Sequence, residues 1–406
     1  MAGTARKILR LVDKGLGPAT IGLLAAHDRL RRGRGPTAVA AASAPPAGIL
    51  VIKLVGLGDT VLMLTPLRRL RECFPKAKIT ALVTPLSAGI LSGQPALDEV
   101  IVFDALHLGR SPAGAARLVR DLRARRFDCV IDFEQHFQLS AALAYLTGAA
   151  RRIGFSWNRD PRGKMFTDPV SPAPDDHMVE SFSRLLEPLG VAPRPIEALE
   201  EIATSLEDRT RVDRWLADRG IGRRDLVVAV HPGSGPRAPH RRWDKAKFAE
   251  ITRRLGADLG AKVVLTGTAE ERALVQEVMA MAATPGVFNA GGEFTVAQMA
   301  ALAKRCGLVL SNDTGTMHVA AAMGVPTVGL FGPESPRRYG PFGRCNRSVY
   351  KHLACSPCIE IHRGRHRKCG DPQCIADIAV EEVWAVIQEY GLETSAAGQA
   401  NDGRWR

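Results

Sequence analysis

The sequence predicts an α/β protein in which two doubly wound, Rossmann-like parallel sheets face each other across an interdomain cleft. Three observations favour this architecture. The chain has 406 residues, which is more than one hydrophobic core usually contains. Short apolar runs alternate with helical stretches in two successive series, a pattern typical of parallel strands covered on both faces. The first strand of each series runs into a Gly-rich turn, where such sheets bind ligands.

The apolar runs give the order of the elements. The first series places strands at Ile49–Val55, Ile79–Val83, Val100–Phe103 and Cys129–Phe133. The second series places strands at Leu226–His231, Lys262–Thr266, Gly286–Asn289, Leu308–Ser311 and Thr327–Phe331. We therefore expect a basic N-terminal extension and linker over 1–48, a first domain over 49–205, a second domain over 206–375 with a Cys-rich loop at 345–374, and a C-terminal helix and tail over 376–406.

The charge of the chain is concentrated at its start. The formal net charge is +13, and residues 1–48 contribute eight Lys and Arg against two Asp. Such clustering at one end favours attachment to an anionic membrane surface over a binding face for a polyanion. The aromatic and basic signature of RNA-binding modules is absent from the sequence, so we expect no nucleic-acid partner.

Residues 4–32 mix apolar and basic side chains, which predicts interrupted amphipathic helices lying on a membrane. The alternative is a helix that packs on the protein itself. We expect no membrane span, because the uncharged stretch Gly15–Ala26 is far shorter than the roughly 20 residues that a transmembrane helix needs. These features predict a cytoplasmic protein that is attached peripherally to the inner face of the cytoplasmic membrane.

The first Gly-rich turn follows the strand that begins at Ile49. Gly56 and Gly58 give the backbone room to turn, and Asp59 then lies at the start of a helix, pointing into the cleft. The Asp59 carboxylate is either a functional group in the cleft or a plain N-cap of that helix. A dinucleotide-binding fingerprint is excluded, because Val61 stands where the third glycine belongs.

The second Gly-rich turn is Gly233-Ser234-Gly235, and it is followed by Arg241, Arg242 and Lys245. Clustered N–H groups with cations close behind are suited to holding a diphosphate. The alternative is a Gly-rich connector with solvated arginines.

A polar hairpin over Asn312–Thr316 follows the strand Leu308–Ser311 and leads into a helix of small residues. Free amides at the start of this helix, with Thr314, Thr316 and His318 beside them, suit a phosphate or sugar hydroxyls. His318 has the alternative of being a core histidine. The sequence contains no P-loop, nucleophile elbow, zinc-protease motif or Asp-x-Asp pair, so neither those chemistries nor a metal-held diphosphate is indicated.

Together the three motifs resemble those of glycosyltransferase family nine, the ADP-heptose:lipopolysaccharide heptosyltransferases. The resemblance covers about residues 49–390, and its most specific part is Asn312–His318 with Phe331–Pro333. It implies the GT-B fold and an inverting transfer that needs no catalytic cofactor or metal. It also implies an ADP-heptose donor and a lipid-linked saccharide of the lipopolysaccharide core as acceptor.

The resemblance implies that Asp59 is the general base and that Asp313, Thr314, Gly315 and His318 belong to the donor-binding loop. The family usually has Lys where this sequence has Arg241. Further donor contacts are expected from Ser234, Arg241, Lys245, Thr266, Glu270 and Thr316. Acceptor and loop contacts are expected from Gly56, Gly58, Thr60, Gln135 and His136, with Arg159 and Lys164 as further acceptor candidates.

Of the eight cysteines, five cluster near the C-terminus, and four of these have the spacing of a metal site: Cys355, Cys358, Cys369 and Cys374. Two pairs of thiolates on two turns can hold one tetrahedral ion, zinc or iron, in a structural role. The resemblance adds that some relatives carry an iron site of four cysteines at this end. The alternative is unligated cysteines in a basic loop. The remaining three, Cys73, Cys129 and Cys306, lie in apolar stretches and are expected to be inert core residues.

Three rival functions remain open. A nucleotide-sugar epimerase of the same fold would share the donor loop but would turn over the donor alone. A metal-stabilised nucleic-acid-binding protein would use the net charge and the cysteines, and its binding would depend steeply on salt. A non-catalytic sugar-binding scaffold would keep the cleft without consuming donor.

Overall fold

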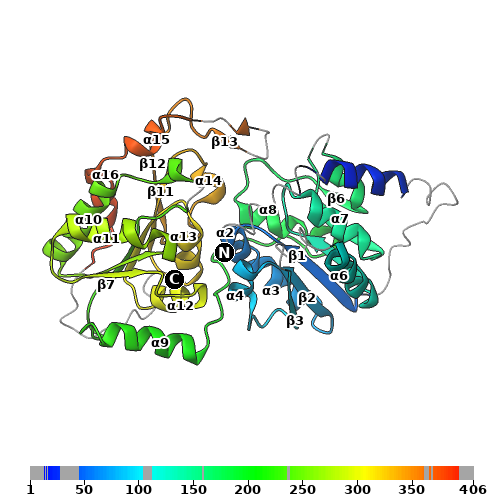
Figure 1. The fold of residues 1–406 in the computed structure, drawn as a ribbon, viewed down its shortest axis with the longest axis horizontal. Helices are drawn as coiled ribbons and strands as arrows, with labels where there is room; N and C mark the ends of the chain where they lie inside the picture. Colours follow the sequence, from blue (N-terminus) through cyan, green and yellow to red (C-terminus); the bar gives the residue numbers. More distant parts are fainter. Residues whose placement is uncertain are drawn as a thin grey trace. The chain divides into compact units, whose positions relative to one another are not determined.

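The computed structural model describes residues 13, 15, 17–27, 45–103, 112–157, 160–235, 238–360, 365–366 and 369–392 (Figure 1). The chain divides into two compact units. The first unit extends to Pro195 and the second begins at Ile196, except that Asp175–Met178 belong to the second.

The first unit contains a six-stranded parallel sheet in the order β3-β2-β1-β4-β5-β6. Its strands are β1 (Gly48–Lys53), β2 (Lys78–Val83), β3 (Glu99–Val102), β4 (Cys129–Asp132), β5 (Arg151–Phe155) and β6 (Asp168–Val170). The four predicted strands are confirmed. The strands β5 and β6 were not predicted, because β5 opens on two arginines and β6 is a three-residue edge strand containing Pro169.

Helices surround this sheet. They are α2 (Leu57–Leu62), α3 (Leu64–Cys73), α4 (Pro85–Leu91), α6 (Pro112–Ala124), α7 (Gln138–Leu146) and α8 (Met178–Arg184), with short 3-10 helices at Pro161–Met165 and Glu187–Leu189. The helix α7 packs on β1, β4 and β5, whereas α4 packs on β2 and β3. Both faces of the central strand β1 are therefore covered, and Leu50 and Ile52 are completely buried.

The second unit repeats the architecture, with the strand order β12-β11-β10-β7-β8-β9 and all neighbours parallel. Its strands are β7 (Val227–His231), β8 (Lys262–Gly267), β9 (Val287–Gly291), β10 (Leu308–Asn312), β11 (Thr327–Phe331) and β12 (Arg347–Tyr350). The five predicted strands are confirmed. The sixth, β12, was not predicted because its sequence, RSVY, is polar and its burial partial, as expected of an edge strand.

The helices of the second unit follow the same alternation. They are α9 (Leu206–Ala217), α10 (Lys245–Leu259), α11 (Arg272–Ala282), α12 (Val296–Ala303), α13 (Gly315–Ala322), α14 (Pro336–Tyr339), α15 (Gln373–Ala376) and α16 (Val380–Gln388), with 3-10 helices at Pro239–Arg241 and Ala269–Glu271. A two-stranded antiparallel ribbon joins β13 (Ile359–Glu360) to β14 (Arg365–His366).

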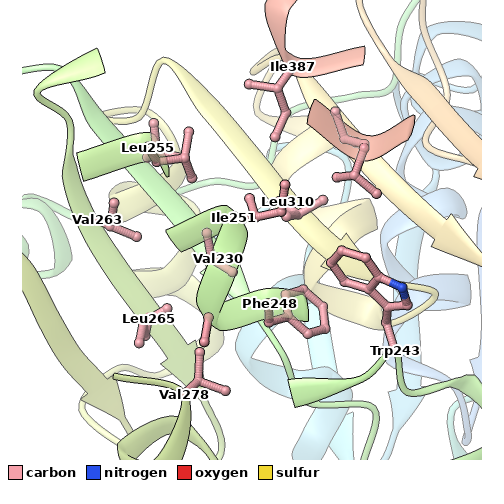
Figure 2. Close-up of a cluster of buried hydrophobic side chains, with 14 of the residues drawn as sticks. Val230, Trp243, Phe248, Ile251, Leu255, Val263, Leu265, Val278, Leu310 and Ile387 are labelled. Atoms are coloured by element: carbon pink, nitrogen blue, oxygen red, sulfur yellow. The ribbon is translucent and has the colours of Figure 1, made fainter. Parts of the chain in front are cut away.

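The core of the second unit forms where α10 and α16 pack on the sheet (Figure 2). Val230 and Leu310 project from the central strands towards Phe248 and Ile251 of α10, and all four are completely buried. Trp243 lies immediately before the Asp244 N-cap of α10, and its indole N–H donates to the Ile378 carbonyl at 2.9 Å. This core fixes the carboxyl ends of β7 and β10, which carry the polar residues of the site.

The N-terminal segment packs on the protein over the residues that the structure describes. Within the helical residues 17–27, Ile21 is completely buried and belongs to the same core cluster as α7. The Asp13 carboxylate accepts the Leu139 N–H at 2.7 Å, and His27 Nδ1 lies 2.9 Å from the Tyr145 hydroxyl. The packed helix is therefore the correct alternative for 17–27, while the rest of the predicted 4–32 segment lies outside the described residues. Within the described part of the chain, no helix has both the length and the apolar character of a membrane span.

Candidate active site

Asp59 lies just beyond the carboxyl end of β1, in the first turn of α2. The chain turns at Gly56, which adopts a φ of +91°. A Cβ at this position would lie 3.0 Å from Asp59 Oδ2, so both the backbone and the neighbouring carboxylate require glycine. Gly56 itself is the N-cap residue of α2, and no side chain caps that helix. The N-cap alternative for Asp59 is therefore wrong, and its carboxylate is available for other contacts.

Two side chains contact the Asp59 carboxylate, and both reach the same oxygen. Lys53 Nζ lies 3.2 Å from Oδ2, and Gln135 Nε2 donates to Oδ2 at 3.4 Å. The Asp59 side chain keeps 21 % of its surface exposed, whereas Lys53 is completely buried. We call Lys53, Asp59, Glu134 and Gln135 the Asp59 site. It joins the predicted base to one predicted acceptor residue.

Glu134 is the second carboxylate beside Lys53. Its Oε2 lies 3.2 Å from Lys53 Nζ, and its Oε1 accepts the N–H groups of Leu54 and Val55 at 2.6 and 2.7 Å. Burial alone would lower the pKa of Lys53, but the two carboxylates raise it above its usual value. Lys53 is therefore a fixed cation at neutral pH.

A completely buried arginine holds the loop that carries Glu134 and Gln135. Arg162 donates from Nη2 to Asp132 Oδ2 and to the Glu134 carbonyl, both at 2.8 Å, and from Nη1 to the Gln135 carbonyl at 2.6 Å. Burial raises the pKa of Asp132 to about 6, although the Arg162 guanidinium lowers it. Asp132 is thus ionised at neutral pH and pairs with Arg162, which gives the loop a rigid anchor.

The other predicted acceptor residues differ in their contacts and in their exposure. The His136 ring stacks on Trp157 with centroids 5.5 Å apart, and the Trp157 indole N–H donates to the Gln135 carbonyl at 3.1 Å. The Thr60 hydroxyl is buried and bonds to the Gly56 carbonyl and Ser87, which gives it a local structural role. Gly58 lies in the first turn of α2. Lys164 is exposed in a 3-10 helix, and Arg159 lies outside the described residues.

In the second unit, a buried glutamate organises the Gly233–Gly235 turn. The Glu271 carboxylate accepts the N–H groups of Gly235 at 2.8 Å and Thr268 at 3.0 Å. Burial alone would raise the pKa of Glu271, but His231 and these backbone donors hold it below its usual value. A Cβ on Gly233 would lie 2.3 Å from Glu271 Oε1, so glycine is required there. The predicted Glu270 is exposed at the adjacent position.

The predicted residue Ser234 lies within this turn, and the predicted residue Thr266 contacts the end of the strand that leads into it. Thr266 is buried, and its hydroxyl lies 3.0 Å from His231 Nδ1. Burial lowers the pKa of His231, so its ring is neutral at neutral pH. The Ser234 hydroxyl is enclosed without a hydrogen-bond partner among the described residues, which do not include 236–237.

Asn312 connects three loops of the second unit through one buried side chain. Its Oδ1 accepts the backbone N–H of Trp243 at 3.0 Å, and its Nδ2 donates to the carbonyls of Pro232 and Gly233 at 3.0 and 2.9 Å. The side chain is completely buried at the end of β10. It therefore fixes the Gly-rich turn and the start of α10 relative to the hairpin.

Arg241 and Asp313 contact each other directly. Arg241 Nη1 lies 3.1 Å from Asp313 Oδ2, and Nη2 lies 2.7 Å from Glu334 Oε1. Both carboxylates are almost buried, whereas Arg241 keeps 26 % of its side chain exposed. The predicted Lys245 is not part of this group, because its ammonium pairs with the exposed Glu277 of α11. We call Gly233–Gly235, Arg241, Asn312–Thr316 and Glu334 the Asp313 site.

The remaining predicted donor residues surround the start of α13. Thr314 is its N-cap residue, and the Thr314 hydroxyl lies 3.0 Å from the Ser311 hydroxyl rather than capping the helix. Gly315 and Thr316 begin the helix and are partly exposed. His318, in the first turn, is buried. Helix starts of this kind attract anions because their first N–H groups have no partner within the helix.

The four predicted metal-binding cysteines are neighbours but do not form a coordination shell. Burial and the nearby thiols of Cys369 and Cys355 raise the pKa of Cys358, and burial with the other three thiols raises the pKa of Cys374 to about 11. In the part of the chain that the structure describes, no three His, Cys, Asp or Glu side chains are arranged to hold a metal ion. The four thiols nevertheless fit a thiophilic cation in kind and number.

The expectation for the other three cysteines is correct for two of them. Cys129 and Cys306 are buried, and burial raises the pKa of each thiol to about 12. Cys73 is exposed, so the prediction that it is a core residue is wrong. It is the last residue of α3, and the apolar residues before it face the core while it does not.

Two doubly wound parallel sheets, each with polar side chains gathered at the carboxyl ends of its strands, are the architecture of GT-B glycosyltransferases. The model of glycosyltransferase family 9 (heptosyltransferase) matches residues 115–366, more than half of the chain. The chain therefore belongs to glycosyltransferase family 9 and is a glycosyltransferase.

Individual relatives agree with this assignment. The chain is 26% identical over 362 residues to the lipopolysaccharide core heptosyltransferase OpsX of Haemophilus influenzae, which covers 86% of this chain and 98% of that protein. A family 9 glycosyl transferase structure from Veillonella parvula has a TM-score of 0.72 at 27% identity, covering 85% and 97% of the two chains. The Escherichia coli heptosyltransferase WaaC with ADP shares the fold, with a TM-score of 0.65 at 20% identity over 84% and 99% of the chains.

Several residues that belong to the two sites, or that hold them in place, were missing from the predicted set of site residues. They are Lys53, Glu134, Arg162, Glu271, Asn312 and Glu334. Lys53 had a detectable signal, because it is a charged residue inside an otherwise apolar strand. Glu271 and Glu334 had none, since only the packing of separate loops brings them to their partners.

Proposed function

We propose that this glycosyltransferase transfers a heptose, or a related sugar, from an ADP-sugar to a lipid-linked saccharide of the lipopolysaccharide core, with inversion and without a catalytic metal. The observation that carries the proposal is the Asp59 carboxylate, which is partly exposed at the end of β1 and held by a buried cation. The name of OpsX supports the acceptor, and the ADP in the WaaC structure supports the donor.

In the proposed reaction, Asp59 takes the proton of an acceptor hydroxyl as that oxygen attacks the anomeric carbon. The new C–O bond forms while the bond from the anomeric carbon to the diphosphate breaks, and ADP leaves with the electron pair. A positioned base contributes about 10²–10⁴-fold to the rate of such a step. The configuration inverts because attack and departure occur on opposite faces of the carbon.

We assign the donor diphosphate to the Asp313 site. Partly exposed backbone at the start of α13 offers N–H groups, and Arg241, which keeps 26 % of its side chain exposed, supplies a cation. Because Asp313 and Glu334 already pair with Arg241, we assign them the role of holding this cation in place. The reaction requires the Asp59 site and the Asp313 site to act on one pair of substrates.

A thermal-shift panel on the purified chain tests the donor. We expect ADP and ADP-heptose at millimolar concentration to raise Tm by several degrees more than the UDP, GDP and dTDP sugars do, because a ligand stabilises only the fold that binds it. Transfer to a lipopolysaccharide-core acceptor is then followed by mass spectrometry. Selectivity for UDP or GDP sugars contradicts the assignment of an ADP-sugar as donor. Turnover of the donor without formation of a glycoside indicates an epimerase. Binding of the donor without turnover indicates a non-catalytic scaffold.

We also propose that Cys355, Cys358, Cys369 and Cys374 hold one structural zinc or iron ion. The four thiols are close enough that Cys355 and Cys369 help to raise the pKa of Cys358 and Cys374, and a bound cation would favour the thiolate form. When bound, the ion cross-links the loop and supplies nothing to the transfer reaction.

Metal analysis of the purified chain checks this site. We expect about one zinc or iron per chain by mass spectrometry of the metals, and we expect C355S/C358S to lose both the metal and several degrees of Tm. C73S, which removes an exposed cysteine outside the cluster, should keep both. A metal-free wild-type chain from metal-replete growth contradicts the proposal.

We further propose that the first unit attaches peripherally to anionic membrane at the inner face of the cytoplasmic membrane. Leu23 is 74% exposed on the outer side of the helical residues 17–27. A groove of about 800 Å³ runs along α6, and Arg120, Arg123 and Arg126 line it beside alanines and Val119. Cations beside apolar surface suit the headgroups of an anionic bilayer.

Vesicle co-sedimentation measures this attachment. We expect binding to vesicles containing phosphatidylglycerol but not to pure phosphatidylcholine, and R120E/R123E should weaken it at least tenfold, since each basic residue near such a surface contributes about 1 kcal/mol. R214E/R223E changes the charge equally on exposed residues of the second unit and should bind as wild type. Equal weakening by both variants would show that net charge alone drives binding.

A further inference from the structure

Lys53 is a completely buried ammonium group that bridges two carboxylates at equal distance. Its Nζ lies 3.2 Å from Asp59 Oδ2 and 3.2 Å from Glu134 Oε2. The alkyl stem leaves β1 at its last residue, and the ammonium lies 5.9 Å from the centre of the Phe182 ring. An ion held this far from water is costly unless its partners are fixed in place.

Glu134 is fixed from two sides. Its Oε1 accepts the N–H groups of Leu54 and Val55, the two residues that follow Lys53. Its own N–H donates to Asp132 Oδ1 at 2.9 Å, and its carbonyl accepts from the buried Arg162. The ammonium of Lys53 therefore has one rigid partner and one partner, Asp59, whose carboxylate is partly exposed.

The contacts on Asp59 are unequal between its two oxygens. Lys53 and Gln135 both reach Oδ2, and within the described residues Oδ1 receives no side-chain hydrogen bond. One oxygen is thus tethered, and the plane of the carboxylate is set by that tether. The charged and polar groups that face Asp59 are Lys53 from β1, Gln135 from the loop after β4, and Glu134 behind Lys53.

We infer that Lys53 is a positioning residue, which ties Asp59 Oδ2 to the rigid Glu134 and so presents Oδ1 in a fixed orientation to the acceptor hydroxyl. This inference rests on the proposed function of Asp59 as the base. Lys53 does not touch substrate. It acts by keeping the carboxylate at one angle, and a base displaced by about 1 Å loses about 10²-fold in rate.

Two variants separate this role from a role in folding. K53M leaves two carboxylates close together without their cation, so we expect it to lose both Tm and kcat. K53M/E134Q also removes the buried partner charge, while the side-chain oxygen of the introduced glutamine still accepts from Leu54 and Val55. We expect the double variant to regain most of the lost Tm, because no unpaired buried charge remains.

The activity of K53M/E134Q decides the inference. We expect kcat to stay about 10²-fold below wild type with the KM for donor unchanged. Recovery of kcat overturns the inference. Recovery of neither Tm nor kcat also overturns it, since the role of Lys53 is then in folding.

Asp59→Asn keeps this result distinct from a failure of the proposed function. If D59N retains kcat, Asp59 is not the base, whatever the Lys53 variants do. If D59N is inactive while K53M/E134Q is fully active, the base assignment stands and only the positioning role is removed.

Discussion

D59N is expected to lower kcat by about 10²–10⁴-fold while leaving donor binding unchanged, because it removes the proton acceptor and nothing that holds the nucleotide. The asparagine keeps the volume of the side chain, and its amide oxygen still accepts from Lys53. Steady-state transfer kinetics measure kcat, and the thermal shift produced by the donor measures its binding.

The matched control for this substitution is D121N. Asp121 lies on α6 with 56% of its side chain exposed, so the same loss of one negative charge should leave kcat unaltered. Near-native kcat in D59N with normal donor binding would falsify the assignment of the base. A loss of donor binding together with kcat would instead place Asp59 in contact with the donor.

N312D is expected to destabilise the second unit by about 3 kcal/mol or more and to weaken donor binding with it. Only one atom of the side chain changes, but that atom donates to the carbonyls of Pro232 and Gly233. A carboxylate oxygen in its place leaves two buried carbonyl groups without a donor and brings negative charge towards both. Chemical denaturation measures the change, and donor titration reports the disordering of the Gly-rich turn.

N289D provides the comparison. Asn289 also donates from Nδ2 and accepts from a backbone N–H, but its partner is the Gln276 side chain on the surface of the same unit. The Gln276 amide can rotate to donate to the new carboxylate, which backbone carbonyls cannot do. We expect a change within about 0.5 kcal/mol. Equal effects of the two substitutions would mean that Asn312 does not hold the loops.

Residue patterns near the strands indicated the positions of Asp59 and Asp313 in the fold but not the side chains that contact them. Asp59 and Asp313 each follow a buried strand, and a parallel sheet brings the ends of its strands to one edge, so both positions could be inferred from order alone. Glu270 was predicted as a donor contact and Glu271 was not considered, because a sequence pattern cannot tell which of two adjacent glutamates turns inward. In the structure the buried Glu271 holds the Gly235 N–H, whereas Glu270 faces solvent.

The sequence also could not predict which side chains of separate loops contact each other, and here the reason is different. Arg241 was expected to face a diphosphate, and Asp313 to belong to the same donor site, yet nothing in the spacing indicated that the two side chains contact each other. Likewise the C-terminal residue of α3, Cys73, follows apolar residues but lies on the exposed side of the helix. Contacts of this kind depend on the angle at which separate elements pack.

The amino-acid sequence by itself determined the two doubly wound sheets and the position of nine strands, because these depend on hydrophobic periodicity and on Gly-rich turns that are local in the chain. The family followed from the resemblance of its motifs to those of known members. Tertiary structure alone decided which charges neutralise one another. Lys53 meets Glu134, and Arg162 meets Asp132, across separations in sequence that carry no periodic signal. Buried ions are stable only with a partner within a few ångströms, and that distance is set by packing.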